Sequence, residues 1–169
     1  PMLDENTLVI VISQSGETAD TLEGAREAKA AGASVLAITN VVGSSIARES
    51  DMVVYLWAGP EISVASTKAY TSMLIALYLI GFYFGDVSGR VDEAEMQTML
   101  RALEALPEQA EEILAPENID RIKAIAAEYK DAKDLFYIGR GMDWAVAQEG
   151  ALKLKEISYI HAEAYAAGE

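Results

Sequence analysis

The sequence of 169 residues contains no cysteine and only one histidine. Without cysteine the chain can form no disulfide, no thiolate metal site and no thiol nucleophile. One histidine and no cysteine leave too few ligand types for a metal site, and we assemble no Ser-His-Asp triad from the sequence. We therefore expect neither a metal nor a cofactor. Any chemistry should rely on carboxylates, lysines and hydroxyls.

Positive charge is also scarce, with 13 Lys and Arg against 27 Asp and Glu and a net charge of −14. This balance argues against nucleic-acid partners and anionic membranes, because affinity for a phosphate backbone comes mainly from clustered cations. A phosphorylated ligand must therefore be held by helix dipoles, hydroxyls and a few well-placed cations. The N-terminus lacks the pattern of a signal peptide, so we expect a cytoplasmic protein.

Long hydrophobic runs are rare as well. The longest candidate, residues 73–84, has 12 apolar residues, whereas a membrane-spanning helix needs about 20. We expect this run to form a helix buried inside a globular core, with no membrane as a partner.

Short β-branched runs alternate with helical patterns, which predicts βαβ units around a parallel sheet. We expect an α/β fold with three αβα layers of the Rossmann or flavodoxin type. Strands are expected at 7–12, 34–39, 52–57 and 135–138, and helices near 19–29, at 45–49, at 63–84 and from Gly141 to Ile157. The acidic, Ala-rich stretch 86–133 predicts a helical connector with breaks at Gly89, Pro107 and Pro116. No element is expected in 158–169.

The most informative segment is Ser13-Gln14-Ser15-Gly16-Glu17-Thr18, between a buried strand and a helix. Hydroxyls and helix N–H groups at the carboxyl end of a strand indicate an anion site, although ordinary capping with a glycine turn is the alternative. A second cluster, residues 63–67, is expected to open the long helix at the same edge. Ser66 and Thr67 could complete a sugar-phosphate pocket there; capping by Ser63 alone explains the cluster equally well.

Glu149, Lys153 and Glu156 are spaced i, i+4 and i+7, so they share one face of a predicted helix. A carboxylate base beside an ammonium suits proton transfer, and an exposed ladder of salt bridges is the alternative. His161 fits a structural or interface role at least as well as acid–base chemistry.

Three segments, 12–21, 61–69 and 149–165, closely resemble the isomerase region of the glutamine–fructose-6-phosphate aminotransferase family, which contains two sugar isomerase (SIS) domains. The resemblance extends over nearly the whole chain. It implies that residues 1–85 form the later part of a first SIS domain, 86–133 a helical connector, and 134–169 the beginning of a second. It also implies a homodimer that binds hexose phosphates such as fructose-6-phosphate and glucosamine-6-phosphate.

The resemblance assigns roles to individual residues. Glu156 matches the base that moves a proton between the first two sugar carbons, Lys153 a lysine close to the reacting sugar, and Glu149 a supporting carboxylate. The residues implied to bind the sugar phosphate are Ser13, Gln14, Ser15, Thr18, Val64 and Ser66.

The resemblance also implies missing parts. The cysteine-dependent glutaminase domain, the first strand with its ligand loop, the ring-opening histidine and the Schiff-base lysine of the family have no match here, and His161 does not align with that histidine. We expect the isolated chain to bind hexose phosphate weakly or not at all, and not to turn over. The alternatives are a non-catalytic SIS module that senses a phosphosugar, and a nucleotide-binding unit on Gly139-Arg140-Gly141, which lacks the third glycine and the ribose-binding acid.

Overall fold

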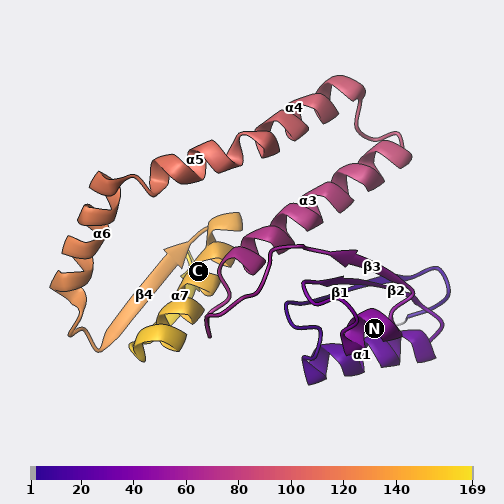
Figure 1. Ribbon diagram of the computed structural model, residues 1–169, viewed down its shortest axis with the longest axis horizontal. Helices are drawn as coiled ribbons and strands as arrows, with labels where there is room; N and C mark the ends of the chain where they lie inside the picture. Colours follow the sequence, from indigo (N-terminus) through magenta and orange to yellow (C-terminus); the bar gives the residue numbers. More distant parts are fainter. Residues whose placement is uncertain (1–2, 169) are drawn as a thin grey trace. The chain divides into compact units, whose positions relative to one another are not determined.

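The computed structural model describes residues 3–168, which form two compact units, one extending to Met99 and one beginning at Leu100 (Figure 1). The first unit contains β1 (Leu8–Ser13), α1 (Ala19–Ala30), β2 (Ser34–Thr39), α2 (Ser45–Glu49), β3 (Met52–Tyr55) and α3 (Lys68–Val87). Helix α4 (Glu93–Glu104) begins in the first unit and ends in the second. The second unit continues with α5 (Leu106–Ile113), α6 (Pro116–Tyr129), β4 (Asp134–Gly139), α7 (Met142–Ser158) and β5 (His161–Ala166).

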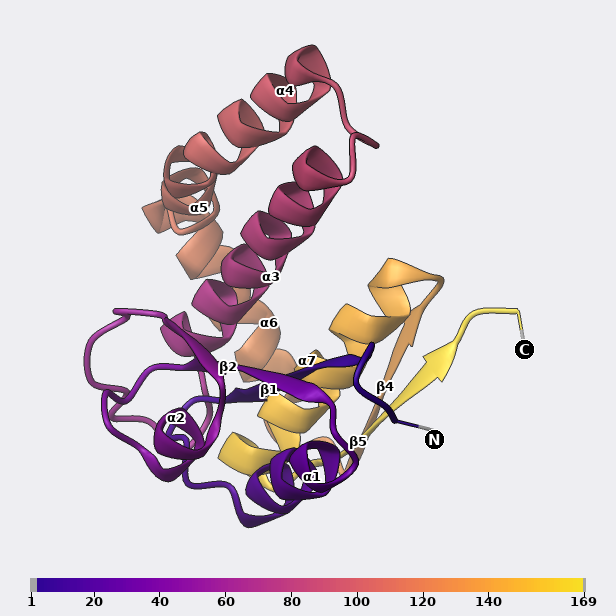
Figure 2. The same ribbon diagram turned by 90° about the vertical axis from the view of Figure 1, so that its right-hand side faces the viewer.

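The first unit has a parallel sheet in the order β1-β2-β3, which confirms the α/β fold class. Strand β2 lies in the middle, where both of its edges are paired, and Val35, Ala37 and Ile38 are 0% exposed. Helices α1 and α2 lie together on one face of the sheet, and α3 lies on the other (Figures 1 and 2). Ala25 and Ala28 are the residues through which α1 approaches the core, because small side chains allow close packing.

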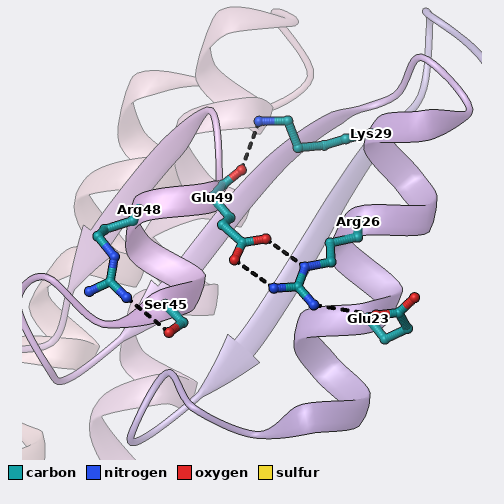
Figure 3. Close-up of polar contacts among 6 residues, drawn as sticks. All are labelled: Glu23, Arg26, Lys29, Ser45, Arg48 and Glu49. Carbon is teal, nitrogen blue, oxygen red and sulfur yellow. Dashed lines mark hydrogen bonds and ion pairs between the residues drawn. The ribbon is translucent and has the colours of Figure 1, made fainter.

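Ionic contacts fasten α1 to α2 (Figure 3). Arg26 donates two hydrogen bonds, from Nε and Nη2, to the carboxylate of Glu49 at 2.7 and 2.8 Å. Lys29 Nζ donates to Glu49 O at 2.7 Å and lies 2.9 Å from Asp51 Oδ1. The hydrogen bonds from Arg26 lower the pKa of Glu49, and the hydrogen bond from Lys29 lowers that of Asp51. These contacts fix the two helices whose N-termini carry the loops described below.

Helix α3 differs from the expectation in two ways. It begins at Lys68 rather than Ser63, and it is not buried inside a core: among its residues only Ala69 and Ala76 are buried. The exposed large residues of α3 are Leu74, Tyr78, Leu79, Tyr83, Phe84 and Val87. The sheet of the first unit covers one side of this helix, and the described residues of that unit supply no second layer. By length and composition alone α3 could cross a membrane, a property that core helices of globular proteins share.

The second unit has a parallel pair of strands, β4 and β5, with α7 packed on it. Strand β5 lies in the stretch where no element was expected, so that prediction was wrong. Its sequence, HAEAYA, is rich in alanine and has weak strand propensity, and pairing with β4 decides its conformation. Gly139 lies so close to α7 that a Cβ would collide with the backbone of Asp143. Gly139, the last residue of β4, therefore has a packing role.

The helical character of the connector is confirmed by α4, α5 and α6. Gly89, with φ of +65°, lies in the turn after α3. The predicted break at Pro107 is confirmed, because α4 ends at Glu104 and Pro107 occupies the first turn of the next helix, α5. Pro116 begins α6 in the same way. Both prolines take the position at which a missing N–H has no cost, since first-turn N–H groups lack partners within the helix.

Candidate functional site

The loop between β1 and α1 is folded around the hydroxyl of Ser13. Ser13 Oγ accepts a hydrogen bond from the Gly16 N–H at 3.0 Å and lies 2.8 Å from Thr18 Oγ1. Ser13 is 5% exposed, whereas Gln14 and Ser15 are half-buried and Thr18 is exposed. Thr18 is the N-cap residue of α1, yet its side chain does not cap the helix. Because the Thr18 hydroxyl does not accept hydrogen bonds from the first-turn N–H groups of α1, those groups are available to another acceptor. Such an arrangement suits the binding of an anion.

The same loop contacts the beginning of α2. Gly16 O accepts the Ile46 N–H at 3.0 Å, and Glu17 Oε1 accepts the Ser45 N–H at 2.8 Å. Gly16 has φ of +67°, and a Cβ at this position would collide with the side chain of Ser44. Hydrogen bonds from Ser45 lower the pKa of Glu17, so its carboxylate is charged at neutral pH. The close approach explains why glycine is needed here.

Asn40, directly after β2, connects the loops that follow the three strands. Its backbone N–H donates to Gln14 O at 3.1 Å. Its side chain accepts the Ala58 N–H at 2.9 Å and donates to Gly59 O at 2.7 Å. The segments after β1, β2 and β3 therefore meet at one edge of the parallel sheet, as expected, and this is the edge at which open α/β sheets bind ligands.

The hydroxyl cluster after β3 lies in a loop ahead of α3 rather than inside its first turn. Ser63 does not cap the helix, because the carboxylate of Glu61 takes that role through Thr67 and Ala69. The interpretation of this cluster as capping by Ser63 alone was therefore wrong. Val64 is 91% exposed, and Ser66 Oγ is enclosed without a hydrogen-bond partner among residues 3–168.

On α7, the three charged side chains come together as the helical spacing predicted. Lys153 Nζ lies 2.7 Å from Glu149 Oε1 and 3.4 Å from Glu156 Oε2. The side chains of the three residues are between 24% and 32% exposed, so they are not a fully solvated ladder. Burial alone would lower the pKa of Lys153, but hydrogen bonds and charges from the two carboxylates outweigh burial and raise it. At neutral pH the site is an ammonium flanked by two potential bases, which suits proton transfer next to a developing oxyanion.

His161 belongs to a separate group of contacts at the start of β5. Its Nδ1 lies 3.0 Å from Asp134 Oδ1 on β4, and its Nε2 lies 3.6 Å from Glu163 Oε1. Glu163 also pairs with Lys155 at 3.4 Å. His161 thus contacts both strands of the pair, which supports the structural interpretation. In the part of the chain that the structure describes, no group of three or more His, Asp or Glu side chains could hold a metal ion.

The profile of the SIS domain family matches residues 1–81 and 128–169. The chain belongs to the SIS domain family. It is 57% identical to the glutamine–fructose-6-phosphate aminotransferase [isomerizing] of Clostridium acetobutylicum, over all of this chain and 28% of that protein. Identity to the enzyme of the same name from Thermus thermophilus is 52%, again over 28% of its length. The SIS chain therefore spans little more than a quarter of these curated relatives, and the resemblance read from its three motifs is confirmed.

Solved structures agree with this membership. The C-terminal domain of glucosamine-fructose-6-phosphate aminotransferase from Francisella tularensis superposes with a TM-score of 0.95 at 39% identity, over 100% of the SIS chain and 47% of that chain. A putative phosphosugar isomerase from Clostridium difficile 630 gives a TM-score of 0.86 at 26% identity, over 96% and 46%.

Sequence reasoning on the SIS chain missed the residues that hold the loops in place. Asn40 was not singled out, because an asparagine after a strand is a common turn residue. Glu61 lies just before the hydroxyl cluster, but its contacts six and eight residues downstream depend on how the loop folds back. No periodic signal in the sequence could have revealed either residue.

Proposed function

We propose that this SIS chain is part of the isomerase region of a glutamine–fructose-6-phosphate aminotransferase, where it binds hexose 6-phosphate and carries the base for ketose-to-aldose isomerisation. The observation that carries the proposal is the placement of Lys153 between Glu149 and Glu156, in a chain 57% identical to an enzyme of that name. The charged face of α7 offers the groups this reaction needs, and the edge of the first sheet offers a phosphate site.

The phosphate is proposed to bind at the loop between β1 and α1. Gln14, Ser15 and Thr18 offer an amide and hydroxyls at the surface, and Ser13 holds the loop from inside. Val64 and Ser66, in the loop before α3, line the sugar. This set compensates for the net charge of −14, because local dipoles and hydroxyls bind a phosphate where the overall field of the protein repels it.

The proposed chemistry is a proton transfer between two neighbouring carbons. Glu156 takes a proton from C1 of the ketose, and the electron pair moves to form an enolate-type intermediate. The protonated carboxyl then returns the proton to C2 while the O1 hydroxyl proton passes to O2. C1 thereby becomes the aldehyde carbonyl and C2 an alcohol carbon, so the product is the aldose, with no net oxidation or reduction. The ammonium of Lys153 stabilises the negative charge that develops on oxygen, and Glu149 orients that ammonium.

The larger protein is proposed to act in the cytoplasm as a homodimer, with residues 1–85 and 134–169 in two successive SIS domains joined by the connector 86–133. The two segments matched by the family profile, with a gap between them, support this division. Sedimentation of the intact protein tests the dimer.

The experiment that tests the function replaces Glu156 by Gln in the intact protein. Glu156→Gln keeps the size of the side chain and removes the base, so kcat should fall about 10²- to 10⁴-fold with little change in KM. The matched control is Glu163→Gln, which changes a carboxylate of the same unit that pairs with Lys155. Exchange of the C1 proton with deuterated solvent, followed by NMR, isolates this step. If Glu156→Gln exchanges like the wild type, Glu156 is not the base. If the wild type itself shows no exchange while fructose-6-phosphate still binds, the chain is a non-catalytic phosphosugar sensor.

A further inference from the structure

We infer that Glu61 is a positioning residue that holds the loop of residues 61–67 in its ligand-binding conformation, an inference that rests on the proposed function of this loop. Both oxygens of its carboxylate are in use. Glu61 Oε2 accepts hydrogen bonds from the Thr67 N–H at 3.2 Å and the Ala69 N–H at 3.1 Å. Glu61 Oε1 accepts a hydrogen bond from the Thr67 hydroxyl at 3.0 Å. One side chain thus joins the beginning of the loop to the first turn of α3.

These contacts replace the usual cap of a helix. Thr67 is the N-cap residue of α3, but it has φ of −119° and ψ of −91°, and its side chain does not cap the helix. Its hydroxyl donates to Glu61 instead. The carboxylate therefore satisfies N–H groups at the start of a helix of 20 residues, where a negative charge is also favoured by the helix dipole. The hydrogen bond from Ala69 is the main cause that lowers the pKa of Glu61.

Glu61 fixes both ends of the loop of residues 61–67, and one residue within the loop is buried. The neighbouring side chains are exposed. Ala65 is 1% exposed and packs into the first unit. Ile62 and Val64, on either side of it, are 93% and 91% exposed. The hydroxyl of Ser66 is enclosed and has no partner within the described residues. Exposed apolar side chains on a fixed backbone are what a preformed binding loop presents.

A positioning role predicts a particular kinetic signature. Holding the loop before the ligand arrives lowers the entropy lost on binding, so loss of Glu61 should raise KM and leave kcat nearly unchanged. A purely structural role would lower the melting temperature alone. In the intact protein, Glu61→Ala should raise KM for fructose-6-phosphate roughly tenfold and change kcat less than about twofold. Glu61→Gln, which retains one acceptor oxygen, should lie between Glu61→Ala and the wild type.

Asp92 provides a matched control. Its Oδ1 accepts the Glu95 N–H at 2.8 Å, so it also caps a helix, but it closes no long loop. Asp92→Ala should lower the melting temperature about as much as Glu61→Ala while leaving KM unchanged. Amide hydrogen exchange at Thr67 and Ala69 should become faster in Glu61→Ala and stay unchanged in Asp92→Ala.

A third variant separates failure of this inference from failure of the proposed function. If Ser66→Ala raises KM and Glu61→Ala does not, Glu61 has only a structural role and the inference is overturned while the binding loop stands. If neither variant changes KM, the loop does not bind the sugar phosphate, and both the inference and that part of the proposed function fail. A rise in KM for both variants, with faster exchange at Thr67 and Ala69 in Glu61→Ala, supports the inference.

Discussion

The two units position their candidate functional residues in different ways. In the first unit, the proposed binding loops depend on contacts between segments far apart in the sequence, such as Asn40 with Gln14 and Glu17 with Ser45. In the second unit, Glu149, Lys153 and Glu156 stand on one helix and meet because of its periodicity alone. We therefore expect the proposed recognition in the first unit to be sensitive to packing, and the proposed chemistry on α7 to be sensitive mainly to the identity of the charged groups.

The largest difference should appear between two isoleucines. Ile38 in β2 is 0% exposed, and Ile138 in β4 is 72% exposed. Ile38→Ala should lower the free energy of unfolding by about 2 to 5 kcal/mol, because it leaves a cavity in a close-packed core. Ile138→Ala should change it by about 0.5 kcal/mol or less. Urea unfolding of the chain measures both. Equal losses for the two variants would show that the face of β4 around Ile138 is as well covered as β2.

The next prediction concerns Gly16. Gly16→Ala combines a positive φ with a collision against Ser44, so the free energy of unfolding should fall by about 2 to 4 kcal/mol, with loss of sugar-phosphate binding. Gly43→Ala is the control, because φ is +72° there but no atom lies within 4 Å of the added Cβ. It should cost about 1 to 2 kcal/mol and retain binding. Calorimetric titration of the intact protein with fructose-6-phosphate measures the binding. Equal behaviour of the two variants would rule out close packing as the reason for glycine at position 16.

A smaller effect is expected from Lys153. In the intact protein, Lys153→Met removes the cation between Glu149 and Glu156, and kcat should fall roughly 100-fold with little change in the affinity for inorganic phosphate. Lys153→Arg keeps the charge and should recover part of the activity. Steady-state kinetics and phosphate binding are measured on the same samples. A loss confined to phosphate binding would place Lys153 in recognition rather than in chemistry.

The smallest effects should appear at extremes of pH. The first unit should lose stability in acid, and the second unit should lose stability in alkali. The pKa values of Glu17, Glu49, Asp51 and Glu61 are lowered in the first unit, so their stabilisation is present at neutral pH and is lost as pH falls through those lowered values. The pKa of Lys153 is raised in the second unit. Its stabilisation is present below the ordinary lysine value and is lost as pH rises through the raised one.

Two tryptophans allow this pH comparison to be measured. Trp57 lies in the first unit and Trp144 in the second. Fluorescence of Trp144→Phe therefore reports on the first unit, and that of Trp57→Phe on the second. Acid below about pH 4 should perturb Trp57 before Trp144, and alkali above about pH 10.5 should perturb Trp144 first. The opposite order at either extreme would contradict the prediction that the four carboxylates stabilise the first unit and that Lys153 stabilises the second.

Much of the fold could be predicted from local patterns. The strand at Ser34–Thr39 and the helix at Ser45–Glu49 have the expected bounds, because β-branched runs and short helical segments are local signals. The start of α3 was placed five residues too early. Hydroxyl residues are common at helix beginnings, and only the contact from Glu61 shows that the chain is still a loop at Ser63.

Sequence alone determined that any phosphate recognition by this chain must use hydroxyls and dipoles, since Lys and Arg number 13 against 27 acidic residues. It also determined that three charged groups share a face of α7. Helical periodicity and composition are local properties, so no tertiary information was needed. The tertiary structure alone decided that HAEAYA is a strand, that one side of α3 is exposed, and that Glu61 caps α3. Each of these depends on a partner segment that the local sequence does not specify: β4 for the strand, the covering layer for the helix, and the returning loop for the carboxylate.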